Sequence, residues 1–389
     1  MEPLGRFYTT DPISQLLVSR FSQDSPRHIL DIGAGDGSLL NAAYNRWQNA
    51  TFHAADVDPA SIAKISLHLP FVRLQKVDGL SPGLDRKMSL KVNSVDIAIC
   101  NPPYLRVKST PETMLILRKA GFLNSLLLKR LTSDIIFLAQ NLLLLKEEGE
   151  LGIILPDSIF SGHEFACLRE DMITKNKING VIQLPDKIFS KTEARTHILL
   201  LEKNGKPNRL TALYQADNLG KLTAPLYISA EQAVQRMDYS YYYWKNQQKQ
   251  TCSHSRLGDL DVEIKRGRSS KKVLQDLGIK FFHTSSFPGA SPFVRLESIS
   301  IPGEVIAEPG DILISRVGKR CMGRVAVVES GAQVISDCVY RLRTKLEYKE
   351  TIWKALVSPE GKQWFQANAH GVCARCLSKK NLLTFPIPL

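Results

Sequence analysis

Short β-rich runs alternate with longer stretches of helical character along the first half of the chain. Runs at 28–31, 51–57, 71–77 and 94–100 have the length and the Val, Ile and Phe content of strands. The stretch 38–47, between the first two runs, has a helical pattern. Strands that alternate with helices form a mostly parallel sheet covered on both faces, so the pattern predicts an α/β domain.

The alternation continues to about residue 203. Residues 123–146 are Leu-rich and amphipathic, which predicts one long helix or a broken pair. Further strands are predicted at 152–155, 180–184 and 196–201. Because the last two follow each other directly, we expect an antiparallel edge on the sheet.

After residue 226 the alternation stops. The polar and aromatic stretch 235–255 predicts a linker that opens a new module. Short strands separated by Gly and Pro are predicted beyond it, at 311–315, 323–328 and 338–342. We therefore predict an α/β domain over 1–235 and a second, mostly β domain of the α+β kind over 236–389.

The charge of the chain is uneven. Its 389 residues include 51 Lys and Arg against 38 Asp and Glu, a net charge of +13. Residues 1–244 hold 28 basic against 25 acidic side chains, whereas residues 245–389 hold 23 against 13. A basic module beside a nearly neutral one favours a polyanionic partner such as nucleic acid, although solubility alone would also explain the excess.

Composition also limits the class of protein. The 43% hydrophobic and 23% charged residues are ordinary for a folded domain. No run approaches 18 uncharged apolar residues, and no apolar run follows the first six residues, so we expect neither a membrane span nor a secretory signal. Seven scattered cysteines, an odd number, indicate a reducing cytoplasm. Cys373 and Cys376, with His370 nearby, lack a second ligand pair, so we expect no metal.

A glycine-rich turn follows the first predicted strand, in the order Asp31-Ile-Gly33-Ala-Gly35-Asp-Gly37. Glycines there let a ligand approach the backbone at the carboxyl end of a parallel strand. The spacing G-x-G-x-G differs from the G-x-G-x-x-G fingerprint of dinucleotide sites. The aspartates beside the turn suit a cationic ligand better than a pyrophosphate.

Two further aspartates end the next two predicted strands. Asp56 could accept both hydroxyls of a ribose, and Asp78 could accept from an adenine amine. Each aspartate taken alone is more often a cap or a turn residue. Together they predict S-adenosylmethionine, whose sulfonium is positively charged, as the cofactor.

The tetrad Asn101-Pro102-Pro103-Tyr104 stands directly after the fourth predicted strand. Two prolines end the strand and stiffen the loop, since neither has an N–H to pair. The Asn101 side-chain oxygen and the Pro102 carbonyl could each accept a hydrogen from an exocyclic amine and position its nitrogen, with no separate general base. Tyr104 offers a flat face for a planar substrate, and a base in duplex DNA must first be flipped out.

The glycine-rich turn followed by this tetrad resembles the amino-methylating, adenine-specific DNA methyltransferases of the gamma class. The resemblance covers roughly the first 235 residues and implies a Rossmann-like sheet that binds S-adenosylmethionine. It implies that Thr9 reaches the methionine part of the cofactor, that Asn101 lies at both cofactor and substrate, and that Phe189 supplies a second face for the flipped adenine. Gly79 stands where the family often has an apolar or aromatic residue.

The last third resembles a target-recognition domain of type I restriction specificity subunits, in segments such as 310–316 and 377–382. This resemblance implies docking on duplex DNA, with basic side chains on phosphates and base edges. The candidate DNA-binding residues are Lys265, Arg266, Arg268, Lys271, Lys272, Arg316, Lys319 and Arg320. For any one of them a solvated surface position is the competing interpretation.

The sequence therefore predicts a cytoplasmic, nucleoid-associated adenine-N6 DNA methyltransferase of a restriction–modification system. One recognition module favours a monomer, with a separate cognate nuclease or subunit as an open alternative. Methylation of RNA or of a protein glutamine amide uses the same tetrad and stays open. So does a non-catalytic DNA-binding or specificity protein that keeps the cofactor fold.

Overall fold

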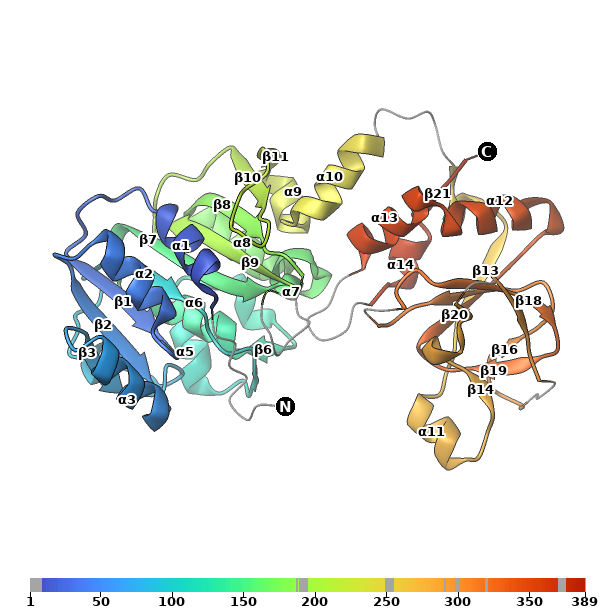
Figure 1. Ribbon diagram of the computed structural model, residues 1–389, viewed down its shortest axis with the longest axis horizontal. Helices are drawn as coiled ribbons and strands as arrows, with labels where there is room; N and C mark the ends of the chain where they lie inside the picture. Colours follow the sequence, from blue (N-terminus) through green and yellow to red (C-terminus); the bar gives the residue numbers. More distant parts are fainter. Residues whose placement is uncertain are drawn as a thin grey trace. The chain divides into compact units, whose positions relative to one another are not determined.

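The computed structural model describes residues 9–186, 188, 195–248, 255–289, 292–297, 301–318, 321–369 and 376–388. Contacts divide the chain into two units, Met1–Tyr239 and Ser240–Leu389. This boundary falls inside the segment predicted as a linker, and the helix α10 (Tyr239–Gln248) forms much of that segment. Figure 1 shows the helices and strands of both units. The functions assigned to the two parts stay predictions.

A nine-stranded sheet forms the centre of the first unit, in the order β11-β10-β8-β9-β7-β4-β1-β2-β3. Its strands are β1 (His28–Ile32), β2 (Thr51–Asp56), β3 (Arg73–Lys76), β4 (Val95–Cys100), β7 (Leu145–Pro156), β8 (Lys177–Gln183), β9 (Thr196–Glu202), β10 (Leu210–Gln215) and β11 (Leu226–Ser229). The strands from β3 to β7 pair in parallel, as predicted. This order and the helical connections confirm the predicted Rossmann-like α/β fold.

The antiparallel part of the sheet differs from the prediction. β9 pairs antiparallel with both β7 and β8, so it lies inside the sheet rather than at its edge. The antiparallel edge is formed by β11, which pairs with β10, while β3 forms the other edge. Six of the seven β9 residues are buried, as an interior strand requires, and the run of Ile and Leu in β9 fits that burial.

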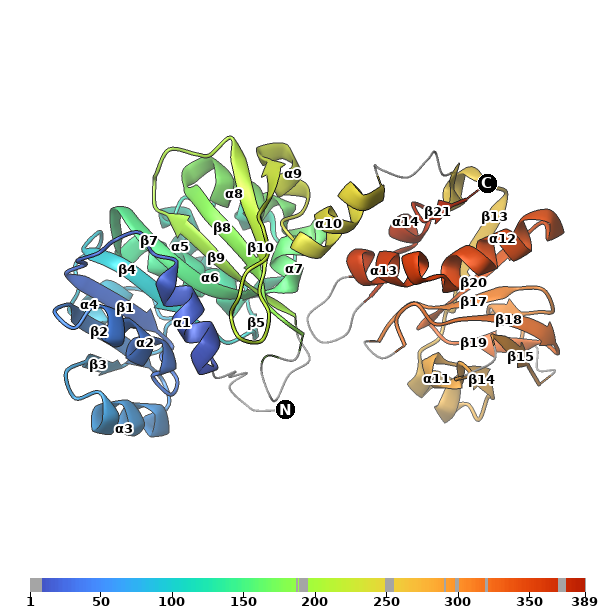
Figure 2. The same ribbon diagram turned by 45° about the horizontal axis from the view of Figure 1, so that its top comes forward.

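Helices cover both faces of this sheet. The first unit contains α1 (Asp11–Ser19), α2 (Ser38–Arg46), α3 (Pro59–His68), α4 (Leu84–Lys87), α5 (Pro111–Lys119), α6 (Ser133–Leu144), α7 (Asp157–Ser161), α8 (Ala166–Lys175) and α9 (Ala230–Gln235), with short 3-10 turns at Asn124–Leu127 and His163–Phe165 and a two-stranded ribbon, β5 (Arg106–Val107) and β6 (Leu131–Thr132). Apolar residues of α1, α2 and α3 form one core cluster with the sheet. Figure 2 shows α5, α6 and α8 on the opposite face.

Residues 123–146 were predicted to form one long helix or a broken pair, and this prediction is wrong in its first part. Only residues 133–144 form a helix, α6, preceded by the 3-10 turn and by strand β6. Eleven of the twelve α6 residues are buried, because α6 packs under the sheet. A helix buried nearly all round lacks the polar face that would mark where it begins in the sequence.

The second unit is mostly β, as predicted. A five-stranded sheet, β13-β20-β17-β18-β15, lies beside a three-stranded sheet, β14-β19-β16, and a short β12-β21 pair. Its strands are β12 (Ser255–Arg256), β13 (Val262–Arg266), β14 (Phe281–Phe282), β15 (Phe293–Arg295), β16 (Ile306–Ala307), β17 (Ile312–Ser315), β18 (Val325–Ser330), β19 (Gln333–Ile335), β20 (Val339–Thr344) and β21 (Pro386–Ile387). Its helices after α10 are α11 (Lys271–Asp276), α12 (Leu346–Val357), α13 (Pro359–Asn368) and α14 (Lys379–Leu382), with 3-10 turns at Leu257–Asp259 and Thr284–Ser286.

Aromatic side chains join the helices of the second unit to its sheet. Trp364 and Phe365 of α13 contact Phe385 and are each 1% exposed. They share a core cluster with Ile314 of β17 and Leu342 of β20. This core holds the five-stranded sheet rigidly, so residues at its strand ends have fixed positions relative to one another.

Candidate active site

A cavity of about 230 Å³ opens at the carboxyl ends of the parallel strands of the first unit. All seven residues that the sequence predicted around the cofactor line it: Thr9, Asp31, Gly33, Gly35, Asp56, Asp78 and Asn101. They come from the segment before α1 and from the ends of β1, β2, β3 and β4. Parallel strands place their carboxyl ends at one edge of a sheet, which is why residues so far apart in sequence meet here.

The glycine-rich turn is tied to the end of β2. The Gly33 amide donates to the Ala55 carbonyl at 2.7 Å, and Gly33 has a φ of +74°, a region that favours glycine. The Gly35 amide donates to Asp56 Oδ2 at 2.7 Å, and the Asp58 amide donates to Asp56 Oδ1 at 2.8 Å. Asp56 is thereby held in one orientation at the cavity wall.

Asp31 lies at the base of the cavity and is 1% exposed. Neither of its carboxylate oxygens has a hydrogen-bond partner among the described residues. Burial, together with the negative charges of Asp56 and Asp36, raises the pKa of the Asp31 carboxyl well above its usual range. An unpartnered buried carboxylate beside two other acids is a strong attractor for a cation.

An aromatic wall of this cavity was missed by the sequence analysis. Phe137 of α6 lines the cavity and is 4% exposed. A Cβ atom at Gly79 would lie 2.5 Å from the ring of Phe137, so this ring occupies the space that a larger residue at 79 would take. An aromatic ring from α6 thus lies beside Gly79, the position where the family often has an apolar or aromatic residue. Phe137 sits in a Leu-rich helix, where its pattern is that of an ordinary core residue.

The tetrad forms the loop after β4, next to the cavity. Asn101 Nδ2 donates to Thr9 Oγ1 at 3.0 Å. The Tyr104 hydroxyl lies 3.4 Å from Asn101 Oδ1 and 3.3 Å from the Ile154 carbonyl. Burial raises the pKa of the Tyr104 phenol well above its usual value, so this group stays a protonated donor. Pro102 is buried within the loop, while Asn101 and Pro103 line the cavity.

Ser133, the first residue of α6, fixes the far side of this loop. Its hydroxyl donates to the Pro103 carbonyl and accepts from the Leu105 amide at 2.9 Å. The Ser133 amide in turn donates to the Leu105 carbonyl at 2.9 Å. The sequence analysis missed Ser133, because nothing in the pattern brings residue 133 back to the loop.

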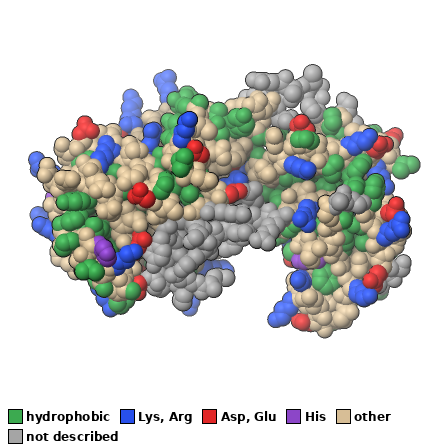
Figure 3. Space-filling model, viewed as in Figure 1, with side chains coloured by type: hydrophobic (Ala, Val, Ile, Leu, Met, Phe, Trp, Pro, Cys, Tyr) green, Lys and Arg blue, Asp and Glu red, His purple; other side chains and the backbone are tan. Residues whose placement is uncertain are grey.

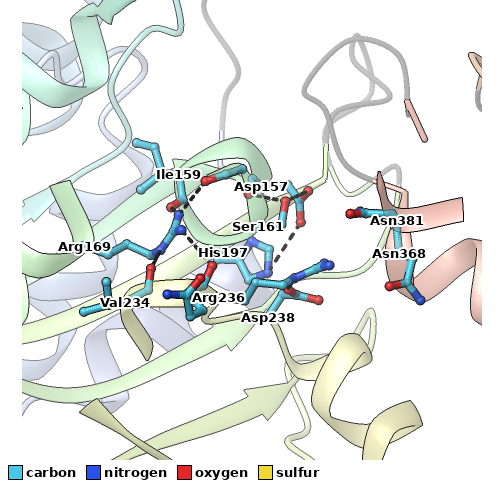
Figure 4. Close-up of polar contacts among 12 residues, drawn as sticks. Asp157, Ile159, Ser161, Arg169, His197, Val234, Arg236, Asp238, Asn368 and Asn381 are labelled. Carbon is cyan, nitrogen blue, oxygen red and sulfur yellow. Dashed lines mark hydrogen bonds and ion pairs between the residues drawn. The ribbon is translucent and has the colours of Figure 1, made fainter. Parts of the chain in front are cut away.

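A second polar cluster, formed by residues of α7, α8, α9 and β9, was also missed. The buried Arg169 guanidinium donates to four backbone carbonyls, those of Ile159, Gly162, Val234 and Gln235 (Figure 4). It thereby joins α7, α8 and the end of α9. An isolated arginine in a helix gives no sequence signal for such a role.

Three residues beside Arg169 have the types of a Ser-His-Asp triad but not its geometry. The Ser161 hydroxyl donates to Asp157 Oδ2 at 2.7 Å, and His197 Nε2 lies 3.8 Å from Asp157 Oδ1. Burial lowers the pKa of His197 to about 3, so its ring is neutral. Because the hydroxyl bonds to the acid rather than to the imidazole, and because all three are buried, we interpret the cluster as structural.

The candidate DNA-binding residues are placed only in part. Lys265 pairs with Glu263 at 2.7 Å, and Arg266 pairs with Asp337 at 3.0 Å. In Figure 3, Lys and Arg side chains are interspersed with Asp and Glu over both units. The predicted residues outside the described part of the chain are Phe189, Lys319, Arg320, His370 and Cys373.

Among the residues that the structure describes, no group of three His, Cys, Asp or Glu side chains could hold a metal ion. Within the same part of the chain, no helix combines the length and the apolar character needed to cross a membrane.

Comparison with known proteins matches residues 2–265 to the family model described as N-6 DNA Methylase. The type II methyltransferase M.BsuBI of Bacillus subtilis is 27% identical over 213 residues, which cover 49% of this chain and 41% of that protein. The type II methyltransferase M.PstI of Providencia stuartii is 28% identical over 204 residues, which cover 46% of this chain and 38% of that protein. The chain thus aligns with less than half the length of these relatives.

A solved structure has the same fold. The type IIG restriction endonuclease BpuSI superposes on 97% of this chain and on 57% of its own length, with a TM-score of 0.53 and 14% identity. This similarity extends through both units of the chain and supports the α/β sheet followed by a mostly β module.

Proposed function

Because the chain belongs to the N-6 DNA Methylase family, we propose that it transfers a methyl group from S-adenosylmethionine to the N6 amine of an adenine flipped out of duplex DNA. The observation that carries the proposal is that the Asn-Pro-Pro-Tyr loop shares a cavity with the unpartnered carboxylate of Asp31. A nucleophile-positioning loop and an attractor for a cation are the two parts that this transfer needs.

The cavity residues fit such a cofactor. S-adenosylmethionine, when bound, supplies an electrophilic methyl group on a positively charged sulfur. Asp56, held by the Gly35 and Asp58 amides, keeps lone pairs for ribose hydroxyls. Asp78, which accepts from the Leu80 amide at 2.9 Å, would accept from the adenine amine. Phe137 supplies an apolar wall for the purine, and Asp31 favours the positive charge.

The loop residues would hold the substrate amine. Asn101 Oδ1 and the Pro102 carbonyl each accept one amine hydrogen, which directs the nitrogen lone pair to the methyl group. Ser133 and the Tyr104 hydroxyl brace this loop, so the acceptors are positioned before the substrate arrives. Tyr104 would stack on one face of the adenine, and Phe189 would stack on the other.

The second unit would bind the duplex. It carries most of the excess positive charge of the chain, which suits a phosphate backbone. The relatives named as type II methyltransferases favour a role in restriction–modification. We propose a monomer that acts as an adenine-specific methyltransferase, with any nuclease supplied by a separate chain.

A methyl-transfer assay with three acceptors tests the proposal. The purified chain and S-adenosylmethionine carrying a labelled methyl group would be incubated with unmethylated duplex DNA, with total RNA, and with protein extract. We expect label in DNA only. Asp56→Ala should raise the cofactor Kd by 10-fold or more, as expected for losing a charged acceptor worth about 1.5–3 kcal/mol. Asp85→Ala, at a residue of α4 that does not line the cavity, should not. Label in RNA or protein, with none in DNA, would contradict the proposal that duplex DNA is the substrate.

A further inference from the structure

One residue of the second unit binds two arginines. Asp337 lies in the turn between β19 and β20, and its carbonyl accepts from Arg266 Nε at 3.0 Å and from Arg316 Nη1 at 3.1 Å. Its carboxylate accepts from Arg266 Nη2 at 3.0 Å. We call Arg266 and Arg316 the arginine pair. Arg266 is 48% exposed and Asp337 24% exposed, so the group lies at the surface.

The sheet explains why the arginine pair converges. Arg266 ends β13, opposite Tyr340 on β20. Arg316 follows the last residue of β17, Ser315, which is opposite Val339 on the other side of β20. Both arginines therefore flank the start of β20 at the same end of the five-stranded sheet. The Arg316 guanidinium also lies 5.9 Å from the centre of the Tyr340 ring.

A close backbone approach holds the neighbouring loop in place. A Cβ atom at Gly267 would lie 2.2 Å from the Ser336 carbonyl oxygen, so only glycine fits there. The Gly267 amide donates to the Val339 carbonyl at 3.2 Å, and the Asp337 amide donates to the Ser269 carbonyl at 2.9 Å. The loop after β13 is thus fastened to the same turn that holds the arginine pair.

More positive charge follows along this loop. Arg268 Nη1 donates to the Gly303 carbonyl at 2.6 Å. Lys271 and Lys272 open α11, are exposed, and have no ion pair with any described residue. Two acids near these side chains already have partners: Asp337 accepts from Arg266, and Glu304 accepts from the Ser269 hydroxyl.

We infer that the arginine pair reads base edges in duplex DNA, with Asp337 as the positioning residue that sets its orientation, while Lys271 and Lys272 contact phosphates. The inference rests on the proposed function, in which the second unit binds DNA. A guanidinium presents paired donors in a plane, which match the two acceptors of guanine in the major groove. Arg266 keeps Nη1 without a partner among the described residues, so it can still donate outward.

A fixed orientation of the arginine side chains distinguishes sequence-specific recognition from non-specific attraction to DNA. An arginine held in one plane donates to a base edge at a smaller entropy cost than one that must first be immobilised. A freely rotating arginine still attracts any phosphate. Loss of the Asp337 carboxylate should therefore weaken binding to the preferred sequence. It should leave binding to other sequences unchanged or stronger, because a negative charge is removed from a surface that faces DNA.

The test is a selection of duplexes from a random-sequence pool by the whole 389-residue chain, which needs no methylation. Fluorescence anisotropy then gives the Kd for the selected duplex and for a scrambled duplex. For Asp337→Asn we expect the ratio of the two affinities to fall by 10-fold or more, with scrambled binding no weaker than in the wild type. Asp276→Asn removes the same charge from α11 without touching the arginine pair, and should keep the ratio.

The phosphate role is checked in the same assay. The double variant Lys271→Ala/Lys272→Ala should weaken binding to both duplexes by the same factor. It should also reduce the slope of log affinity against log salt concentration by about 2. An unchanged affinity ratio for Asp337→Asn would overturn the reading role, as would an equal loss on both duplexes with a lowered Tm. Wild-type protein that selects a sequence but does not methylate it would contradict the proposed reaction alone. Wild-type protein that binds no duplex would contradict both.

Discussion

Asn101 Nδ2 donates a hydrogen bond to Thr9 Oγ1 at 3.0 Å, across 92 residues of sequence. The bond joins the tetrad loop to the segment before α1, and both residues line the cavity. It commits the amide nitrogen to Thr9, so the amide oxygen is directed as the acceptor. In the proposed reaction this oxygen receives a hydrogen of the substrate amine.

Thr9→Val should therefore slow methyl transfer while keeping the shape of the side chain. Loss of one orienting hydrogen bond, worth about 1 kcal/mol, predicts a fall in kcat of roughly 5-fold. Steady-state kinetics on duplex DNA would measure it. Thr10→Val, at the exposed neighbouring residue, is the control and should keep wild-type kcat. Equal rates for both variants would remove Thr9 from the positioning of Asn101.

Asp31 should couple cofactor binding to pH. Its carboxyl has a raised pKa in the ligand-free fold, so the folded protein holds this proton more tightly than the unfolded chain. The stability that Asp31 contributes is fully present below its unfolded pKa, about 4, and is lost as pH rises through the folded pKa. A cationic ligand favours the ionised form, so binding should release a proton.

Isothermal titration calorimetry in two buffers of different ionisation enthalpy would measure that proton. We expect release on binding S-adenosylmethionine, an affinity that rises with pH across the folded pKa of Asp31, and neither effect in Asp31→Asn. Proton uptake, or the same release in the variant, would contradict the role assigned to Asp31.

The residues of the site that lie at the ends of strands could be predicted from the sequence. Asp31, Asp56 and Asn101 each terminate a run that is clearly a parallel strand, and such ends must meet at one edge. Phe137 and Ser133 could not be found this way. They belong to a helix buried on nearly every side, whose pattern gives neither its start nor the side that meets the cavity.

The order of the strands in the sheet could likewise not be predicted from the hydrophobic pattern. The run 196–201 is hydrophobic whether it lies at an edge or inside the sheet, and only pairing with both β7 and β8 decides its place. Arg266 and Arg316 were predicted as DNA contacts from their charge and from the resemblance to a target-recognition domain. Both arginines reach Asp337 because β13 and β17 pair with β20 on either side. No local sequence pattern predicts this strand pairing.

Gly79→Ala should disturb the cavity through Phe137. The new Cβ atom would lie 2.5 Å from the Phe137 ring and 2.8 Å from Ile32, so the ring must move. Overpacking of this kind costs about 1–3 kcal/mol. We expect a lower Tm and a cofactor Kd raised by roughly 10-fold. The double variant Gly79→Ala/Phe137→Leu, which restores space, should recover Tm but not affinity. Wild-type affinity in Gly79→Ala would show that Phe137 does not contact the cofactor.

Arg169→Met should destabilise the first unit. The change leaves four backbone carbonyls, in α9 and in α7 with the residue after it, without their buried donor. Each buried carbonyl left without its donor costs about 1–3 kcal/mol, so the combined loss should be several kcal/mol. Urea unfolding should register a loss of this size, whereas Arg118→Met, at an exposed position of α5, should change stability by less than about 0.5 kcal/mol. Equal stability of the two variants would contradict the linking role of Arg169.

Nucleoside mass spectrometry after reaction with unmethylated genomic DNA tests the central claim most directly. Wild-type protein with S-adenosylmethionine should produce N6-methyladenine. Asn101→Ala should reduce the initial rate by roughly 100-fold or more, as expected for removing a preorganised transition-state contact, while still binding DNA. N6-methyladenine formed at a near-wild-type rate by Asn101→Ala, or N4-methylcytosine as the wild-type product, would contradict the account.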